Sequence, residues 1–339
     1  MRTAPVSALA LALACAHAPG GAAPAAAPRL YVSNEVSNDV SVVDTATDAV
    51  VATIPVGSRP RGLRVSPDGR LLYVAVSGTP ITPPGTERES GRGDRARDGI
   101  AVVDLARGAV ARMLPSGVDP ENFDLSPDGR RLYVSNEEVA GASIVDVESA
   151  RILSSSPVGE EPEGVATRPD GGAVYVTSER ASRVTALGPD GAVLGSFAVA
   201  GRPRTVLFTR DGALAFVTAE EGGTVSVVDA RAHRVVRTIR IEAPRARPMG
   251  LALAPDGKTL WVSNGRGGSA TAIDTGSFEV LRTVETGGAR SWGIAITPDG
   301  KKLYTANGGS DDVSVIDVAS GAIRKKIPVG GKPWGLALR

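Results

Sequence analysis

Charged and aromatic side chains flank a recurring proline in this 339-residue chain, and they are its best candidates for chemistry. One stands directly before the proline and one directly after it. The residues before it are Arg59, Asp119, Glu161, Arg202, Arg247 and Lys332, with Arg290 in the copy where Ser291 replaces proline. The residues after it are Arg61, Glu121, Glu163, Arg204, Met249, Trp292 and Trp334. The proline and glycine of the recurring Pro-x-Gly segment meet requirements of the backbone. Those requirements do not explain why charged and aromatic residues stand directly before and after the proline.

Guanidinium groups combined with indole rings suit one kind of ligand. Arg offers a forked donor that matches a carboxylate, and Trp offers a flat surface for stacking. The two positions therefore predict a site for a small, planar, anionic ligand. We expect its residues to be Arg59, Arg61, Glu121, Glu163, Arg202, Arg204, Arg247, Arg290, Trp292, Lys332 and Trp334.

Other interpretations of these charges stay open. They can pair with one another while the Trp rings fill the space between them, since ion-pair networks are common without any function. Arg64 and Asp124 share a repeat position and are expected to form such a pair. Four acids recur elsewhere in the repeat, where we expect solvated loop charges: Glu35, Glu137, Glu179 and Glu220.

Several classes of chemistry are excluded by composition. The chain has only two histidines, His17 and His233, and one cysteine, Cys15. This excludes a zinc site, a histidine-based catalytic triad and a haem with an axial histidine, and we expect no cofactor. Because 38 basic residues balance 37 acidic ones, we expect no nucleic-acid partner.

The strands and turns that carry these residues recur along the chain. A Pro-Asp-Gly turn recurs with its glycine at 69, 129, 171, 257 and 300, with Arg-Asp-Gly ending at 212 in the same role. Gaps of 41–45 residues, with one of 60, are typical of propeller blades. A short Val-rich strand recurs seven times, beginning near Tyr31, Tyr73, Tyr133, Tyr175, Phe216, Trp261 and Tyr304. These strands predict an all-β, seven-bladed propeller of four-stranded blades.

The two ends of the chain complement each other. Residues 333–339 form a strand with no turn after it, while residues 29–34 lack the strand that precedes their counterparts. We therefore expect residues 333–339 to complete the N-terminal blade and close the ring, which hides the strand edges that favour aggregation. Residues 29–339 are then one domain, which we expect to be monomeric.

Tyr-Val-Ser-Asn strands with Ser-Pro-Asp-Gly turns resemble the YVTN family of β-propellers over residues 29–339. Within it, the chain is most similar to the propellers associated with PQQ-dependent alcohol catabolism, which are exported bacterial proteins. The segments that carry this similarity are 58–62, 116–121, 161–164, 202–204 and 332–335. The resemblance implies an accessory role in quinoprotein oxidation and provides no catalytic residue.

The propeller places the candidate site on one face. Loops before the first strand and after the second strand of each blade open on the same face, so the candidate residues should ring the mouth of the central channel. The long insertion at 78–99 falls on that face and is expected to be a loop. Some propeller lactonases hold Ca²⁺ at this mouth, and the residues here with suitable oxygen ligands are Glu121, Asn122, Asp124 and Glu163.

The N-terminus resembles an export signal. A basic start at Met1-Arg2 precedes an apolar run from Val6 to Ala14, which is too short to span a bilayer. Cleavage before a lipidated Cys15 and ordinary cleavage nearby both remain open. An Ala/Pro-rich linker follows to residue 28. We expect location in the periplasm, with contact to a membrane only through a lipid at Cys15.

Together these features favour an exported, non-catalytic propeller that binds a small anionic ligand or a periplasmic protein at its Arg/Trp-lined mouth. The first alternative is a Ca²⁺-dependent lactonase-type hydrolase at the same face. The second is a structural or adhesive cell-surface repeat protein.

Overall fold

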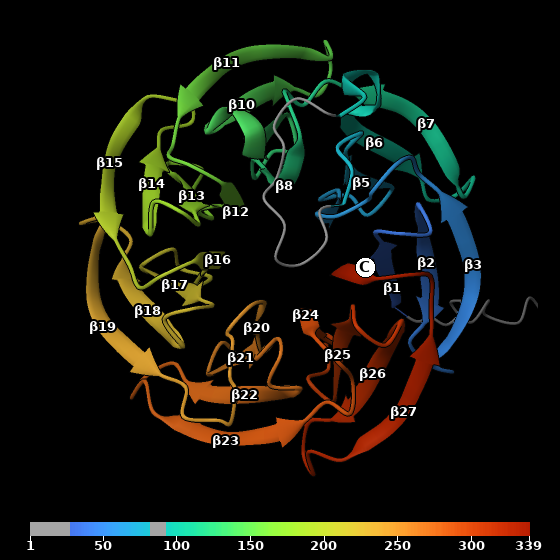
Figure 1. Cartoon of the computed structure of the whole chain (residues 1–339), viewed down its shortest axis with the longest axis vertical. Helices are drawn as coiled ribbons and strands as arrows, with labels where there is room; N and C mark the ends of the chain where they lie inside the picture. Colours follow the sequence, from blue (N-terminus) through green and yellow to red (C-terminus); the bar gives the residue numbers. More distant parts are fainter. Residues whose placement is uncertain (1–27, 82–92) are drawn as a thin grey trace, which may run out of the picture.

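The structure, a computed structural model, describes residues 28–81 and 93–339. Within these residues, 28 strands form seven separate four-stranded antiparallel sheets. The sheets surround a central axis like the blades of a propeller (Figure 1). The predicted fold class is therefore confirmed. Cys15, the signal and half of the insertion (residues 82–92) lie outside the described residues.

From the axis outward, blade one contains β28 (Pro333–Leu338), β1 (Arg29–Asn34), β2 (Asp39–Asp44) and β3 (Ala49–Pro55). Blade two contains β4 (Leu63–Val65), β5 (Leu71–Val76), β6 (Gly99–Asp104) and β7 (Ala109–Leu114). Blade three contains β8 (Pro120–Leu125), β9 (Arg131–Asn136), β10 (Gly141–Asp146) and β11 (Arg151–Pro157). Blade four contains β12 (Pro162–Thr167), β13 (Val174–Ser178), β14 (Arg183–Leu187) and β15 (Val193–Ala198).

Blade five contains β16 (Pro203–Phe208), β17 (Leu214–Ala219), β18 (Thr224–Asp229) and β19 (Arg234–Arg240). Blade six contains β20 (Leu251–Leu253), β21 (Thr259–Ser263), β22 (Ser269–Asp274) and β23 (Val280–Glu285). Blade seven contains β24 (Ser291–Ile296), β25 (Lys302–Asn307), β26 (Asp312–Asp317) and β27 (Ile323–Pro328). Two short 3₁₀ helices, η1 (Arg95–Arg97) and η2 (Glu137–Val139), lie between strands. In the described chain no helix has the length and apolar character to cross a bilayer.

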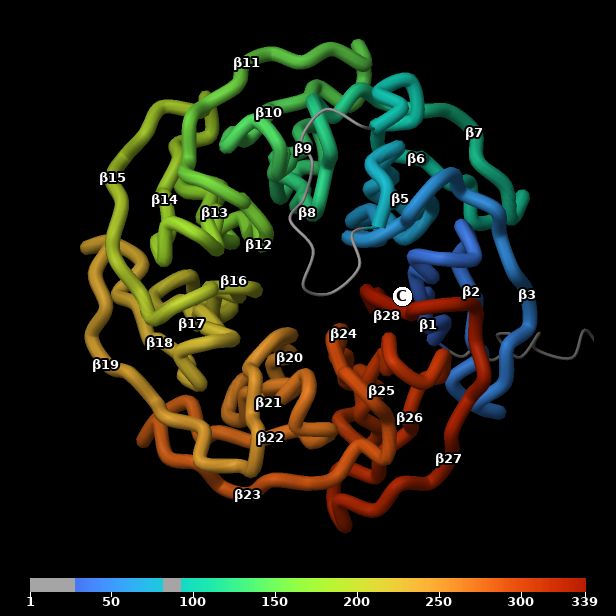
Figure 2. The backbone as a smooth tube through the Cα atoms, in the orientation of Figure 1, coloured from blue at the N-terminus to red at the C-terminus, as the bar shows by residue number. Residues whose placement is uncertain are grey.

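The core lies between neighbouring blades. Inner strands such as β1 are buried along almost their whole length, because each sheet packs face to face against the next. The outermost strands, such as β3 and β7, are largely exposed. They form the rim of the ring (Figure 2). Burial of two faces explains why the inner strands are rich in Val rather than alternating in polarity.

The recurring turns have the backbone geometry that the sequence predicts. The glycines of the six turns, at 69, 129, 171, 212, 257 and 300, have φ between 65° and 73°, which a residue without Cβ adopts most readily. In the first turn the Asp68 carboxylate accepts hydrogen bonds from Ser66 Oγ (2.6 Å) and the Arg70 amide (3.0 Å). These bonds lower the pKa of Asp68. Each turn is therefore fixed locally, independently of the blade around it.

The ring closes as expected. β28 pairs with β1 in antiparallel register, with Leu336 opposite Val32 and Leu338 opposite Leu30. Both ends of the chain thus contribute to blade one (Figure 1). Ser33 Oγ connects this blade to the next, because it donates to the Arg61 carbonyl (2.6 Å) and accepts from the Gly335 amide (2.9 Å).

Removing residues 333–339 should destabilise the ring by about 3 kcal/mol or more, since several ladder hydrogen bonds are lost at roughly 1 kcal/mol each. Urea denaturation of the truncated protein measures this loss. Moving residues 333–339 to a position in front of residue 29 is the matched control, because the same strand can then reach the same edge. Equal stability of the truncated and intact proteins would contradict closure by β28.

Candidate functional site

A left-handed backbone turn positions the mouth of the channel. Six charged residues of the mouth adopt φ of 50–59°, a region that non-glycine residues seldom enter, namely Arg59, Asp119, Glu161, Arg202, Arg290 and Lys332. In this conformation the carbonyl of Asp119 accepts a hydrogen bond from the amide of Glu137 (3.0 Å), which follows the second strand of the same blade. Glu161 and Arg202 accept from Glu179 and Glu220 in the same way. The loops before strand one and after strand two therefore open together, as predicted.

Arg204 forms the centre of a buried ion-pair group, which we call the Arg204 cluster (Arg202, Arg204, Glu163, Glu179 and Glu220). Its guanidinium lies 3.0 Å from Glu163 Oε2 and 2.6 Å from Glu220 Oε2, and it also contacts Glu179. Arg202 Nε lies 2.6 Å from Glu179. Burial disfavours the charged guanidinium, but the three carboxylates together raise the pKa of Arg204. Arg204 therefore stays cationic inside the ring.

Glu163 has the most unusual protonation in this cluster. Burial raises its pKa well above the ordinary value of 4.5, although Arg204 acts in the opposite direction. The charge of Glu179 and a hydrogen bond to it raise the pKa of Glu163 further. Two carboxyl groups so close cannot both ionise easily, so the protonated form of Glu163 is favoured.

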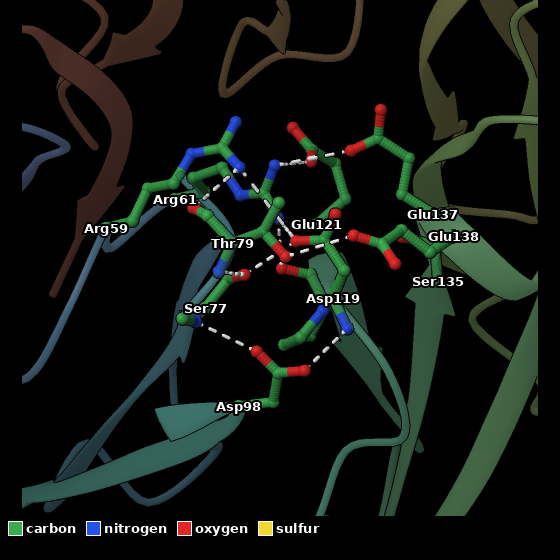
Figure 3. A network of polar contacts seen from close by, with 12 residues as sticks. Arg59, Arg61, Ser77, Thr79, Asp98, Asp119, Glu121, Ser135, Glu137 and Glu138 are labelled. Carbon is green, nitrogen blue, oxygen red and sulfur yellow. Dashed lines mark hydrogen bonds and ion pairs between the residues drawn. The ribbon is translucent and has the colours of Figure 1, made fainter. Parts of the chain in front are cut away.

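A second group, the Arg61 cluster (Arg59, Arg61, Glu35, Asp119, Glu121 and Glu137), lies between blades two and three. Figure 3 shows the Arg61 guanidinium among carboxylates. Arg61 is 1% exposed, with Nη2 2.9 Å from Asp119 Oδ1 and Nη1 in contact with Glu121. Burial and the neighbouring Arg59 lower the pKa of Arg61. Ser77 Oγ donates to Asp119 (2.6 Å), and Arg59 Nε bonds Glu35 (2.8 Å).

The acids after the second strands are not solvated, and that expectation is wrong. Glu35, Glu179 and Glu220 are only 6–9% exposed, and all of them contact arginines of the mouth. The left-handed turn explains the difference, because it brings the end of strand two against the start of strand one. The signal in the sequence was their fixed position one residue after the second strand, in four of the seven blades.

The inner strands enclose a pocket of about 110 Å³ on the axis. Its polar wall comes from blades two to five and consists of Arg64, Asn122, Glu163, Arg204 and Thr205. Its apolar wall comes from blades six, seven and one and consists chiefly of Met249, Leu251, Trp292, Ile294, Trp334 and Leu336. The two indole rings meet edge to face, with centroids 5.7 Å apart, and both remain half-buried. They line the pocket rather than filling it.

The sequence profile of the family described as "Lactonase, 7-bladed beta-propeller" matches residues 22–153 and 196–326. The chain belongs to this lactonase family. The unmatched stretch, 154–195, carries Glu163 and Glu179.

Individual relatives of this lactonase-family protein are distant. Antigen Lp49 of Leptospira interrogans is 33% identical over 107 residues, which is 32% of this chain and 23% of the antigen, so the match spans about a quarter of that relative. The Pseudomonas aeruginosa periplasmic gluconolactonase superposes with a TM-score of 0.73 at 21% identity, covering 92% of this chain and 98% of that one. A Bacteroides fragilis protein assigned as a 6-phosphogluconolactonase superposes at 0.75 and 18%, covering 94% and 99%. At identities this low, the two superpositions show a shared fold and nothing further.

In this lactonase-family propeller, the predicted ligand residues lie in three different surroundings. Glu163, Arg204, Trp292 and Trp334 line the pocket. Arg59, Arg61, Glu121 and Arg202 are held in the two clusters. Arg247, Arg290 and Lys332 have no acidic atom within 4 Å among the described residues. Thr205, Met249 and Arg64 also line the pocket and were absent from the predicted ligand set. Met249 shares the repeat position of the Trp residues, which was a usable signal.

The structure does not bring the four candidate calcium ligands together. Glu121 contacts Arg61, and Glu163 pairs with Arg204. Asp124 pairs with Arg64 at 3.2 Å, as expected, and also accepts from the Thr167 amide. Within residues 28–81 and 93–339 no three acidic, His or Cys side chains form a metal-binding group. Each of the three carboxylates is paired with an arginine instead.

Proposed function

We propose that this protein hydrolyses a lactone in the axial pocket. The observation that carries the proposal is the Glu163 carboxyl, which lines the pocket, is hydrogen-bonded to Glu179 and has a raised pKa. A carboxyl group whose pKa is raised above its ordinary value is suited to general acid–base catalysis. Membership of the lactonase family supports a ring ester as the substrate.

The reaction balances with Glu163 as its only proton carrier. Water attacks the lactone carbonyl carbon while the ionised form of Glu163 accepts a proton from it. The bond between the carbonyl carbon and the ring oxygen then breaks, and Glu163 returns its proton to that oxygen. The product is the open-chain hydroxy acid, and no net proton is left on the protein.

The polar wall also offers donors for the carbonyl oxygen. Asn122 lines the pocket, and its Oδ1 accepts a hydrogen bond from the Phe123 amide, so Nδ2 is the donor that its side chain can offer. Arg64 lines the same wall, with its Nε engaged by Asp124. Donors fixed before the reaction stabilise the negative charge that develops on the carbonyl oxygen. Asn122 and Arg64 are therefore the groups we propose for this role.

The proposal is tested by assaying the purified protein against a panel of five- and six-membered aldonolactones, with pH-stat titration of the acid released. We expect turnover of at least one lactone, and no change when chelator is added, because the three carboxylates among the candidate calcium ligands are paired with arginines. Turnover that requires added Ca²⁺ would support the calcium-dependent mechanism instead. Turnover of no lactone at any pH would overturn the proposal.

A second candidate function is non-catalytic binding of a planar anion, accessory to quinoprotein alcohol oxidation. The half-buried Trp292 and Trp334 rings beside unpaired cations favour it. Binding of pyrroloquinoline quinone by calorimetry, together with inactivity on every lactone, would favour this function over hydrolysis.

We also propose that the protein acts outside the cytoplasm, because residues 1–15 have the pattern of an export signal. Mass spectrometry of the mature protein from the cell envelope distinguishes a lipidated N-terminal Cys15 from ordinary cleavage. A mature protein that retains Met1 would contradict export by this signal.

A further inference from the structure

The rim of the ring consists of the outermost strand of each blade, and each of these strands has a free edge. In blade five this strand is β19 (Figure 2). β19 pairs only with β18, so the backbone N–H and C=O groups of its other edge face no strand among the described residues. A free edge can bind an extended chain as an additional strand. Which rim strand accepts a partner depends on what protects its edge.

β19 is the longest rim strand without a proline. Of the three rim strands with seven residues, β3 ends in Pro55 and β11 ends in Pro157, whereas β19 contains neither proline nor glycine. The other four rim strands have six residues each. A bulge of the kind found in every rim strand leaves Val236 unpaired, and Arg237–Arg240 then continues in regular register with β18. This stretch is exposed apart from Ile239, so a peptide can reach its edge.

The most basic stretch of the sequence contains β19. Residues 231–247 include one acid, Glu242, and six arginines. None of these arginines has an acidic atom within 4 Å among the described residues. They are Arg231, Arg234, Arg237, Arg240, Arg245 and Arg247.

The basic stretch leads from the end of β19 into a groove on the mouth face. The groove encloses about 490 Å³ and lies between the loop after β17 and the loop before β20. Its cationic lining is Arg240, Arg245 and Arg247, and its acidic lining is Glu221 and Glu242. A chain that pairs with β19 can therefore continue from the rim into the groove and stay beside arginines.

These charges select the kind of chain that the edge can bind. Two copies of β19 would place arginines opposite one another, which is unfavourable, so the edge disfavours pairing with its own copy. A strand with carboxylates at alternate positions places acids beside Arg237 and Arg240 instead, and charge-assisted contacts then stabilise the pair. A polyanion without peptide groups contacts the arginines but leaves the backbone groups of the edge unpaired. The combination of free edge and unpaired arginines therefore favours an acidic polypeptide.

We propose that β19 is a docking edge for an acidic, extended segment of a partner protein. The segment adds to blade five as a fifth strand and continues along the groove beside Arg245 and Arg247. Backbone hydrogen bonds supply affinity, and the arginines select acidic side chains. No residue of the groove lines the axial pocket, so this docking does not depend on the proposed hydrolysis.

The test uses a blocked ten-residue peptide of alternating Glu and Thr, with a peptide of alternating Lys and Thr as the control of opposite charge. We expect only the acidic peptide to bind the full-length protein in fluorescence anisotropy, with an affinity that falls at higher salt. Hydrogen exchange should slow at amides within residues 237–240, because the added strand pairs with the free edge. Polyacrylate, an acidic polymer without peptide groups, should compete for the arginines and protect no amide of β19.

Arg237→Gln combined with Arg240→Gln should raise the Kd of the acidic peptide at least about tenfold, since two charge-assisted contacts are lost. Arg324→Gln combined with Lys326→Gln is the matched control. It removes the same charge from the rim strand β27, where both cations contact acids. Its Kd should stay within about twofold of the wild-type value. Melting temperatures check that each variant folds.

Three results would overturn the proposal. Equal protection of β3 or β15, rim strands without charged residues, would mean that the arginines do not choose the edge. Binding of polyacrylate, with no protection of β19 by the acidic peptide, would assign the arginines to a polyanion other than a polypeptide. Failure of the acidic peptide to bind at low salt, with the protein folded, would mean that β19 is not a docking edge.

Discussion

Replacing Glu163 by Gln should lower kcat for lactone hydrolysis by about 100- to 10,000-fold, the range that loss of a general acid–base group produces. Gln keeps the shape of the side chain and a hydrogen bond to Glu179, but it can neither accept a proton from water nor return one to the ring oxygen. Because the variant retains the walls of the pocket, KM should change much less than kcat. Steady-state kinetics on the best substrate measures both.

Glu160→Gln is the matched control, because Glu160 precedes the same strand but its side chain is 69% exposed and it makes only a 4.0 Å contact with Arg180. Its kcat should equal that of the wild type. A Glu163→Gln variant that keeps half of the wild-type kcat would show that Glu163 carries no proton in the reaction, whatever else the pocket does.

The pH dependence gives an independent signature of Glu163. Glu163 first acts as a base, so the reaction needs its ionised form. Since its pKa is raised in the folded protein, that form accumulates as pH rises through the raised value, and kcat/KM should rise there. Stability changes in the opposite direction. The contribution of this proton to folding is fully present below the ordinary value of 4.5 and is lost as pH rises through the raised pKa. Glu163→Gln should remove both dependences.

Arg204→Met should lower the free energy of unfolding by about 3–5 kcal/mol, the usual cost of removing one partner from a buried ion pair. Arg204 is 7% exposed, and without it Glu163, Glu179 and Glu220 are left as three buried acids with only Arg202 nearby. Urea denaturation at pH 7 measures the loss.

Two controls show whether the loss comes from unpaired charge. Arg180→Met removes an exposed arginine from the same face and should change the stability by less than about 0.5 kcal/mol. Combining Arg204→Met with Glu179→Gln and Glu220→Gln removes most of the uncompensated charge and should recover a large part of the stability. A loss below about 1 kcal/mol for Arg204→Met alone would mean that water enters the cluster and solvates its acids.

Most of the fold follows from local sequence. The Pro-Asp-Gly turns depend on a glycine with positive φ and on hydrogen bonds within six residues, as around Asp68, so each is specified by its own segment. The Val-rich strands follow from burial on both faces. Even the closure by residues 333–339 was predictable, because a strand was missing at one end of the chain and extra at the other.

The candidate site was predictable only as a set of positions. Glu121 and Glu163 occupy the same repeat position, and nothing in the sequence distinguishes them. In the structure Glu121 is held against Arg61, whereas Glu163 lines the axial pocket, is hydrogen-bonded to Glu179 and has a raised pKa. The acids after strand two, expected in solvent, turned out to be the counter-ions of the mouth.

The blades, their number and the face that carries the variable residues thus follow from the amino-acid sequence alone. Which charges of the mouth are neutralised depends on how the blades pack, and this is why one half of the mouth is paired and the other half cationic. The difference comes from distance along the chain. Turns and strands depend on neighbours in sequence, whereas the partners of Arg61 lie up to 76 residues away in another blade, and their choice is made by packing and burial.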